Sequence, residues 1–141
     1  MMHSPIRARS FVATLGILVV WLNIAAGCGG HYEVREKIDR ARYKTVYVEK
    51  FDNDEFDMRP RLEQQMVVLG FETTGEKAKA DLTLVWRYTH AMLGTNASVR
   101  LVNAEGKTVY LGEGDNPGFG TALNKTGAVW GCFERALGGL R

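Results

Sequence analysis

The acidic run FDNDEFDMRP, at residues 51–60, is the part of this sequence with the clearest potential for chemistry. Its carboxylates are oxygen ligands of the type that Ca²⁺ binds. A calcium loop of the EF-hand type needs glycine at its sixth position, but counting from Asp52 this position is Asp57, and Pro60 lies inside the loop. We therefore expect no metal site, and interpret the run as solvated carboxylates ahead of a helix, where the helix dipole favours negative charge.

Groups suited to nucleophilic or acid–base catalysis are few. Ser98 is the only serine after residue 10, and it has no G-x-S-x-G setting. His31 and His90 have no cysteine, histidine or carboxylate at a zinc-ligand spacing. An enzyme would have to use carboxylates alone, such as Asp52 with Asp57, held close together with separated pKa values. We therefore expect no catalytic residues, no cofactor and no enzymatic activity.

A glycine-rich segment, GEGDNPGFGT at residues 112–121, precedes a predicted helix, as phosphate-binding loops do. Its spacing fits neither G-x-G-x-x-G nor G-x-x-x-x-G-K-[ST], so we interpret it as a flexible loop from a strand to a helix. Loops on a rigid frame carry recognition, and we expect Asp115, Asn116 and Phe119 to contact a partner.

The charge balance argues against a nucleic-acid partner. The formal net charge is +2, and this includes Arg7 and Arg9; without them, 16 basic and 16 acidic side chains remain. A nucleic-acid binder needs a basic surface that displaces phosphate counterions. The same balance argues against a polybasic membrane patch.

The N-terminus has the three parts of a secretory leader. Arg7 and Arg9 precede the apolar run FVATLGILVVWLNIAA at residues 11–26, and small residues follow. A spanning helix needs ~20 apolar residues, more than this run provides. An uncleaved N-terminal anchor and a buried core helix remain as alternatives.

Ala25, Ala26 and Gly27 before Cys28 resemble a bacterial lipobox, with alanine where the pattern prefers leucine. The resemblance implies that residues 1–27 are cleaved and that Cys28 carries a diacylglycerol and an acylated amine. Two or three acyl chains give stable membrane attachment. In Gram-negative lipoproteins, Gly29 rather than aspartate after the cysteine implies the outer membrane. A disulfide from Cys28 to Cys132 is the alternative in an oxidising compartment, although the sequence around Cys132 favours a small buried hydrophobe.

Hydrophobic periodicity predicts the elements that follow. Residues 29–42 are polar and suit a tether or a short helix. Strands are predicted at residues 44–51, 70–74 and 81–90, and a hairpin around Ala104, Glu105 and Gly106. One helix is predicted from about residue 59 to Gly70, with Asp57 as its N-cap, and a second within residues 120–139.

The predicted order is strand, helix, four strands and helix. Both helices must cover a sheet to bury their apolar stripes. We therefore predict an α+β fold: a two-layer α/β sandwich with a mostly antiparallel sheet of about five strands and two helices. The predicted organisation is a signal peptide at 1–27, an acylated cysteine and tether at 28–43, and the sandwich domain at 44–141.

Four segments resemble small bacterial envelope lipoproteins from about Thr45 to Gly114; they are TVYVEKFDN, RPRLEQQMVVLGFETT, KADLTLVWRYTH and SVRLVNAEGKTVYLGEG. The layout is similar to that of the lipopolysaccharide-assembly lipoproteins, which plug the outer-membrane translocon, and of lipoprotein groups of unknown function. The resemblance implies an α/β sandwich on the periplasmic face of the outer membrane.

We thus expect a lipid-anchored envelope protein that acts through protein contacts or as an accessory to an envelope assembly, with an envelope protein as its partner. The alternative is a periplasmic module that binds a small ligand or glycan through Trp86, Tyr88 or Tyr110 on an exposed sheet face.

Overall fold

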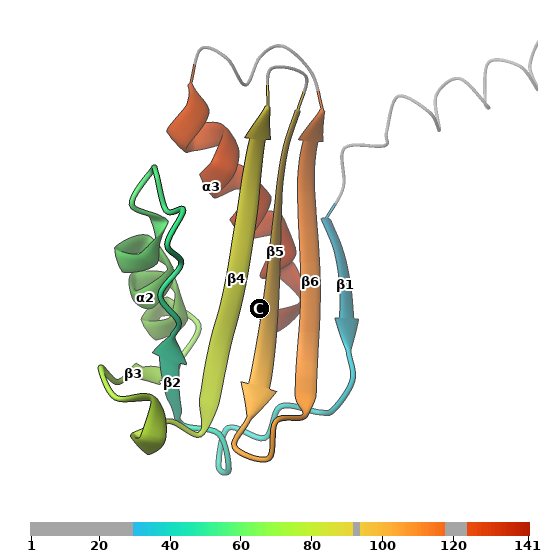
Figure 1. Ribbon diagram of the computed structural model, residues 1–141. Coiled ribbons are helices and arrows are strands. Elements are labelled where there is room, and N and C mark those ends of the chain that lie inside the picture. Colours follow the sequence, from blue (N-terminus) through green and yellow to red (C-terminus); the bar gives the residue numbers. More distant parts are fainter. Residues whose placement is uncertain (1–29, 92–93, 118–123) are drawn as a thin grey trace, which may run out of the picture.

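The computed structural model describes residues 30–91, 94–117 and 124–141. In chain order, the elements are β1 (Gly30–Val34), β2 (Thr45–Val48), α2 (Met58–Val68), β3 (Glu72–Thr73), a short 3₁₀ turn (Lys77–Lys79), β4 (Leu82–Ala91), β5 (Gly94–Asn103), β6 (Thr108–Pro117), α3 (Lys125–Ala136) and a last 3₁₀ turn (Gly138–Leu140). The six strands form one sheet in the order β1, β6, β5, β4, β2, β3 (Figure 1).

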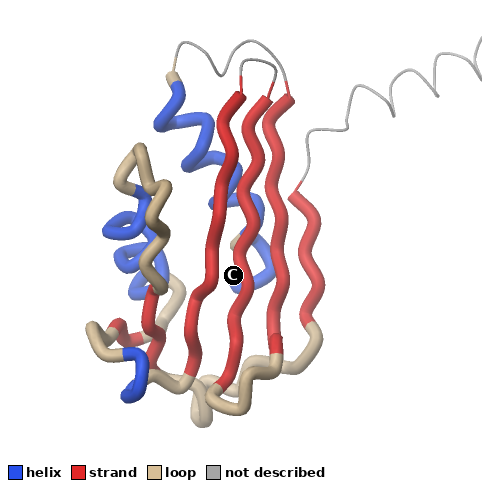
Figure 2. The backbone as a smooth tube through the Cα atoms, viewed as in Figure 1, coloured by secondary structure: helices blue, strands red, loops and turns tan. Residues whose placement is uncertain are grey.

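Most of the sheet is antiparallel, as predicted. β1, β6, β5 and β4 are antiparallel neighbours, whereas β2 is parallel to both β4 and β3. Both helices lie on one face of the sheet, and the other face is not covered by any described helix (Figure 2). The predicted two-layer α+β class is therefore confirmed, with six strands in place of about five.

The additional strand is β1, which lies where the sequence predicts a tether or a short helix. Residues Gly30–Val34 pair with β6 over five residues, with Tyr32 opposite Gly112. All five residues are exposed, so the segment lacks the alternation of buried and exposed residues that identifies a strand in sequence. It is a strand because β6 offers an edge to pair with.

The core lies between the sheet and the two helices. On β4, within the predicted strand at residues 81–90, Leu82, Leu84, Trp86 and Tyr88 are buried and alternate with more exposed residues. Helix α2 contributes Met58, Leu62 and Met66 to the core, and α3 contributes Val129, Cys132, Phe133 and Ala136, among others. Among the described residues, no helix is long and apolar enough to cross a membrane.

Helix α2 is capped by a different residue from the one predicted. Asp57 occupies the N-cap position with φ of +53° and makes no side-chain cap bond. The carboxylate of Asp54 instead accepts hydrogen bonds from the N–H groups of Met58 and Arg59, at 2.8 and 3.1 Å. The helix ends at Val68, and Gly70, the predicted stop, follows two residues later with a φ of +93°, a conformation that glycine adopts without strain.

Strand β6 continues to Pro117, so residues 112–117 do not form the predicted flexible loop. Gly112 and Gly114 lie under α3, where an added Cβ would be 1.8 Å from the Ala136 carbonyl oxygen and 2.0 Å from that of Cys132. Gly30 on β1 has a similar restriction against Arg135. The glycines therefore allow the helix to lie directly on the strand backbone, which is a packing role and not phosphate binding.

Candidate functional site

The face of the sheet opposite the helices is not covered by any described helix, and we refer to it as the open face. Its side chains alternate with the buried ones along β4, β5 and β6 and are half-buried or exposed. It is made by Thr83, Val85, Arg87 and Thr89 on β4, Asn96, Ser98, Arg100 and Val102 on β5, Leu111, Glu113 and Asp115 on β6, and His31 and Glu33 on β1.

The strand register arranges the open face in rows. In one row, Arg87 on β4 lies opposite Ser98 on β5. Ser98 in turn lies opposite Glu113 on β6, and Glu113 lies opposite His31 on β1. The four side chains of this row bring a guanidinium, a hydroxyl, a carboxylate and an imidazole onto one line across the sheet.

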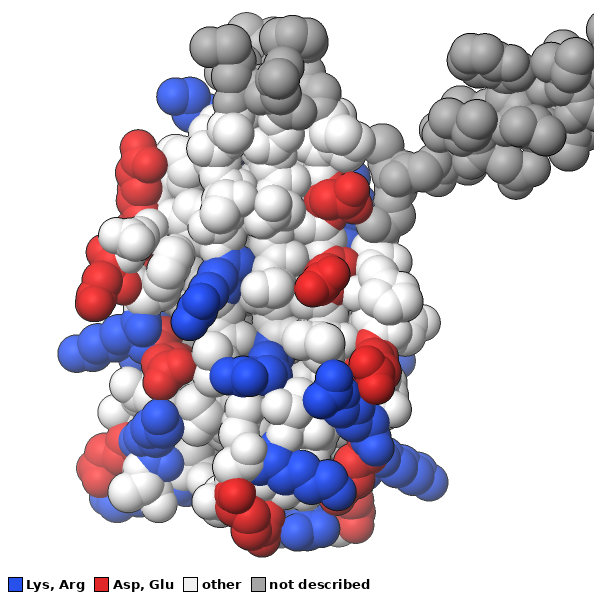
Figure 3. Space-filling view, turned by 45° about the vertical axis from the view of Figure 1, so that its right-hand side comes forward, with Lys and Arg blue, Asp and Glu red and all other residues white. Residues whose placement is uncertain are grey.

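In the neighbouring row, too, the basic residue lies nearer β4 and the acidic residue lies nearer β1. Val85 lies opposite Arg100, which lies opposite Leu111, and Leu111 lies opposite Glu33. The open face thus has a basic half on β4 and β5, made by Arg87 and Arg100. It has an acidic half on β6 and β1, made by Glu113, Asp115 and Glu33. Figure 3 shows this side of the molecule, with acidic and basic side chains interspersed among uncharged ones.

Arg87 and Arg100 are notable because neither forms an ion pair with a described residue, and Glu113 forms none either. Glu33 is paired with Arg35 at 3.3 Å, and both side chains are about half exposed. An exposed pair of this kind contributes little to stability. Most charges of the open face are therefore not used to hold the fold together.

Hollows lie at several places on the described part of the open face. One, of about 510 Å³, is lined by His31, Asn96, Ser98, Glu113 and Asp115 with the backbone around them. A smaller one, of about 260 Å³, is lined on this face by Val85, Arg87, Ser98, Arg100, Leu111 and Glu113. The third, of about 500 Å³, lies at the other end of the face, beside the turn at Gly106.

Structural roles account for two charged groups beside this third hollow. The carboxylate of Asp81 accepts hydrogen bonds from the N–H groups of Lys44 and Thr45, at 2.8 and 3.0 Å, which lowers its pKa. Lys77 pairs with Glu49 at 3.2 Å. These contacts tie the segment before β4 to β2, whereas the charged groups in the middle of the face have no such role among the described residues.

The predicted contact residues belong to this surface only in part. Asp115 and Asn116 lie on β6 and not in a loop, and Asp115 is exposed on the acidic half. The guanidinium of Arg135 on α3 donates to the Asp115 carbonyl oxygen at 2.8 Å. Phe119 lies outside the described residues, as does Cys28, the predicted site of lipidation.

Of the other groups considered for chemistry, the side chains of Cys132 and His90 make hydrogen bonds within the fold, and those of Asp52 and Asp57 make none with a described residue. Cys132 is fully buried and its thiol contacts the Thr95 carbonyl oxygen at 3.4 Å, while burial raises its pKa. His90 contacts the Thr95 hydroxyl at 2.8 Å. Asp52 and Asp57 are exposed to solvent. Across residues 30–91, 94–117 and 124–141, no group of three or more His, Cys, Asp or Glu side chains could hold a metal ion.

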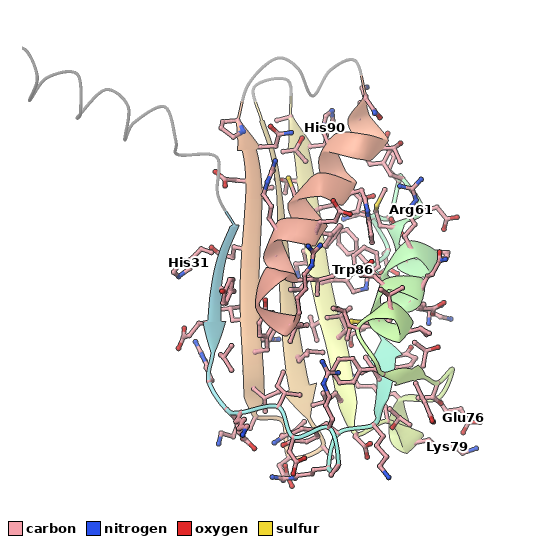
Figure 4. All side chains as sticks on the ribbon, turned by 180° about the vertical axis from the view of Figure 1, so that it is seen from behind. His31, Arg61, Glu76, Lys79, Trp86 and His90 are labelled. Carbon is pink, nitrogen blue, oxygen red and sulfur yellow. The ribbon has the colours of Figure 1, made fainter. Side chains whose placement is uncertain are left out.

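The aromatic residues expected on an exposed face are in the core instead. Trp86, Tyr88 and Tyr110 are at most 8% exposed and lie on the helix side of the sheet; Figure 4 shows Trp86 there. The indole N–H of Trp86 donates to the Glu49 carbonyl oxygen at 2.7 Å, and the Tyr110 hydroxyl donates to that of Ala136 at 2.6 Å. Burial raises the pKa of Tyr110 to about 12. These rings cannot stack on a ligand, so the expected basis for glycan binding is wrong.

No protein-family model and no curated protein sequence matches this chain. Among solved structures, the chain is similar to the PelC dodecamer from Paraburkholderia phytofirmans, at 13% sequence identity and a TM-score of 0.54, over 79% of this chain and 95% of that one. It is also similar to a DUF4136 family protein from Bacteroides thetaiotaomicron, at 14% identity and a TM-score of 0.53, over 72% and 90% of the two chains.

At these identities the similarity shows a shared fold and nothing about activity. It agrees with the coarser part of the expected resemblance, because the α+β fold predicted here also occurs in these bacterial proteins.

Proposed function

We propose that this chain is a lipid-anchored protein of the bacterial cell envelope, on the periplasmic side of the outer membrane, and that it acts without catalysis through protein contacts made by the open face. The observation that carries the contact role is the pair Arg87 and Arg100, which lie in the middle of the open face without a described ion-pair partner. The two guanidinium groups form no described ion pair that would stabilise the fold.

The N-terminal sequence supports the anchor. An apolar run ends at the small residues before Cys28, and Gly30, the first residue of β1, follows that cysteine by two positions. An acylated Cys28 would hold the edge of the sheet near the membrane surface and not at the end of a long tether.

The charge arrangement defines the partner that fits. A segment lying across the strands would meet positive charge on β4 and β5 and negative charge on β6 and β1. We therefore expect an envelope protein that presents an acidic and a basic group about two strands apart, roughly 10 Å. Because the charges are exposed, salt weakens such a contact.

Photo-cross-linking in a Gram-negative host tests the contact role. A photoreactive amino acid replaces Arg87 on the open face, or, as a matched control, Gln64, which is also exposed but lies on α2. We expect a discrete cross-linked envelope protein from position 87 and none from position 64. Equal products from both positions, or none from either in folded variants, would contradict a contact role for the open face.

A further inference from the structure

Strand β1 is an edge strand that is open to pairing. It ends the sheet beyond β6, and no described element lies beside its outer side (Figures 1 and 4). The opposite edge, β3, has only two residues. Short edge strands, prolines and lysines are common means of preventing edge pairing. The sequence of β1, GHYEV, uses neither proline nor lysine and runs over five residues.

The hydrogen-bond pattern shows which backbone groups face outward. The N–H of Arg35, directly after β1, donates to the Val109 carbonyl oxygen of β6. Pairs with and without hydrogen bonds alternate along an antiparallel ladder, so Glu33 and His31 also bond toward β6. The N–H and C=O groups of Gly30, Tyr32 and Val34 therefore point away from the sheet.

These three residues are symmetric about Tyr32, which makes the strand complementary to itself. In an antiparallel pair of two β1 strands, only the register with Tyr32 opposite its own copy pairs all three outward residues. It places Gly30 opposite Val34 of the second copy and forms about six hydrogen bonds, at two per bonded pair.

The side chains suit the same register. His31 and Glu33, on the open face, lie opposite each other across the two copies, so an imidazole meets a carboxylate twice. On the helix side, glycine meets valine and the two tyrosine rings are adjacent. Tyr32 is 50% exposed and Val34 is 48% exposed; among the described residues, Val67 and Val68 on α2 are the other exposed large hydrophobic residues. The ring of Tyr32 is already oriented by stacking on Tyr110, with ring centroids 6.4 Å apart.

We propose that two copies of this chain pair through the outer edges of their β1 strands, antiparallel and centred on Tyr32, and so join two sheets into one. A symmetric contact of this kind closes on itself and leaves no free β1 edge. The open faces of the two copies then form one continuous surface. Where they meet, His31 of each copy lies opposite Glu33 of the other.

Five residues per copy make a small interface, which membrane attachment would strengthen. Holding both copies on one membrane raises their effective concentration; this step rests on the proposed anchor, whereas the pairing itself does not. In the paired strands the two Gly30 residues lie about 14 Å apart, four residues at ~3.4 Å each. Both anchors reach one membrane if the strands lie along its surface.

Cysteine cross-linking of the full chain tests this register. Cα atoms in a hydrogen-bonded antiparallel pair are about 5.5 Å apart, which is within the range of a disulfide, so Tyr32→Cys should form a dimer when membranes are oxidised. Val34→Cys, on the same strand and face, is the matched control, because its two copies would lie about 14 Å apart. We expect roughly tenfold more dimer from Tyr32→Cys than from Val34→Cys. The unsubstituted chain measures the background from Cys28 and Cys132.

Equal dimer from both variants, or a cross-link from position 32 to a different protein, would overturn the proposal. Since Tyr32→Cys loses the contact with Tyr110, a second pair tests the same register without it. Copies with His31→Cys and differently tagged copies with Glu33→Cys are co-expressed; both positions are exposed. We expect cross-links between the two tags and few within either, and their absence in folded protein would also overturn the proposal. The intact mass of the same samples reports the anchor separately.

Discussion

On the covered face of the sheet, apolar side chains of β4, β5 and β6 are buried beneath α2 and α3, whereas the same strands present exposed or half-buried polar and charged groups on the open face. Trp86 and Arg87 are consecutive residues and show the contrast directly: the indole is 3% exposed and hydrogen-bonded, and the guanidinium is exposed without a described ion pair. The covered face stabilises the fold, and the open face is the surface to which we attribute the proposed contacts.

Trp86→Ala should have the largest effect, because it removes a buried ring that contacts Phe51 and Phe133 at centroid distances of 5.3 and 5.8 Å. We expect a loss of about 3–5 kcal/mol in the free energy of unfolding. Urea unfolding measures it. A loss under about 1 kcal/mol would mean that the covered face does not supply the stability assigned to it.

Gly112→Ala should follow, since its Cβ would meet the Ala136 carbonyl oxygen and force α3 away from β6. We expect a loss of about 3 kcal/mol. Gly131→Ala is the matched control within α3, where nothing lies within 4 Å of the new Cβ, and it should gain about 0.5–1 kcal/mol from helix propensity. Equal effects of the two substitutions would refute the packing role of the strand glycines.

Asp54→Ala tests the cap of α2. It removes the acceptor for two helix N–H groups and for the Tyr88 hydroxyl, which donates at 3.1 Å. We expect a loss of about 1–2 kcal/mol in the free energy of unfolding, measured by thermal or urea unfolding. Asp57→Asn retains a residue that tolerates positive φ and should change stability by less than about 0.5 kcal/mol. A larger loss of stability from Asp57→Asn than from Asp54→Ala would show that Asp57 is the capping residue.

Asp81→Ala should produce a pH-dependent loss. Backbone hydrogen bonds lower the pKa of Asp81 in the folded state, so its stabilisation is present above the unfolded pKa and is lost as pH falls through the lower folded value. We expect a loss of about 1 kcal/mol at pH 7 that shrinks below about pH 4. Unfolding curves of both proteins from pH 7 to pH 3 measure this, and a constant difference would contradict it.

Arg87→Ala and Arg100→Ala should have the smallest effects on stability, within about 0.5 kcal/mol. Both should nevertheless reduce capture of an envelope partner, which co-purification from cross-linked membranes measures. Thr89→Ala, on the same face as both arginines and on the same strand as Arg87 but uncharged, serves as the control. A large stability loss with unchanged partner capture would show that the arginines serve the fold.

Regular alternation made much of the fold predictable. Leu82, Leu84, Trp86 and Tyr88 on one side of β4 identify both the strand and its buried face. Gly106, with φ of +81°, forms the turn of the predicted hairpin, where the Asn103 side chain accepts from the N–H groups of Glu105 and Lys107. In these places local preference and tertiary packing agree.

The features that were missed depend on contacts between distant residues. Strand β1 exists through its pairing with β6, although all of its residues are exposed. Gly112 and Gly114 lie in a glycine-rich segment that is typical of a loop. They are glycines because α3 packs directly on their backbone. Alternation along β4 gives only that strand's part of the open face, whereas the basic and acidic halves follow from the register of four strands.

The central claim is the attachment of this chain to an envelope membrane through Cys28, and the intact mass of the membrane-fraction protein tests it most directly. The full-length chain is expressed in a Gram-negative host beside a Cys28→Ala control. We predict a mass equal to residues 28–141 plus acyl groups, and loss of that species in the control. An unmodified mass, whether cleaved or full length, would contradict the account.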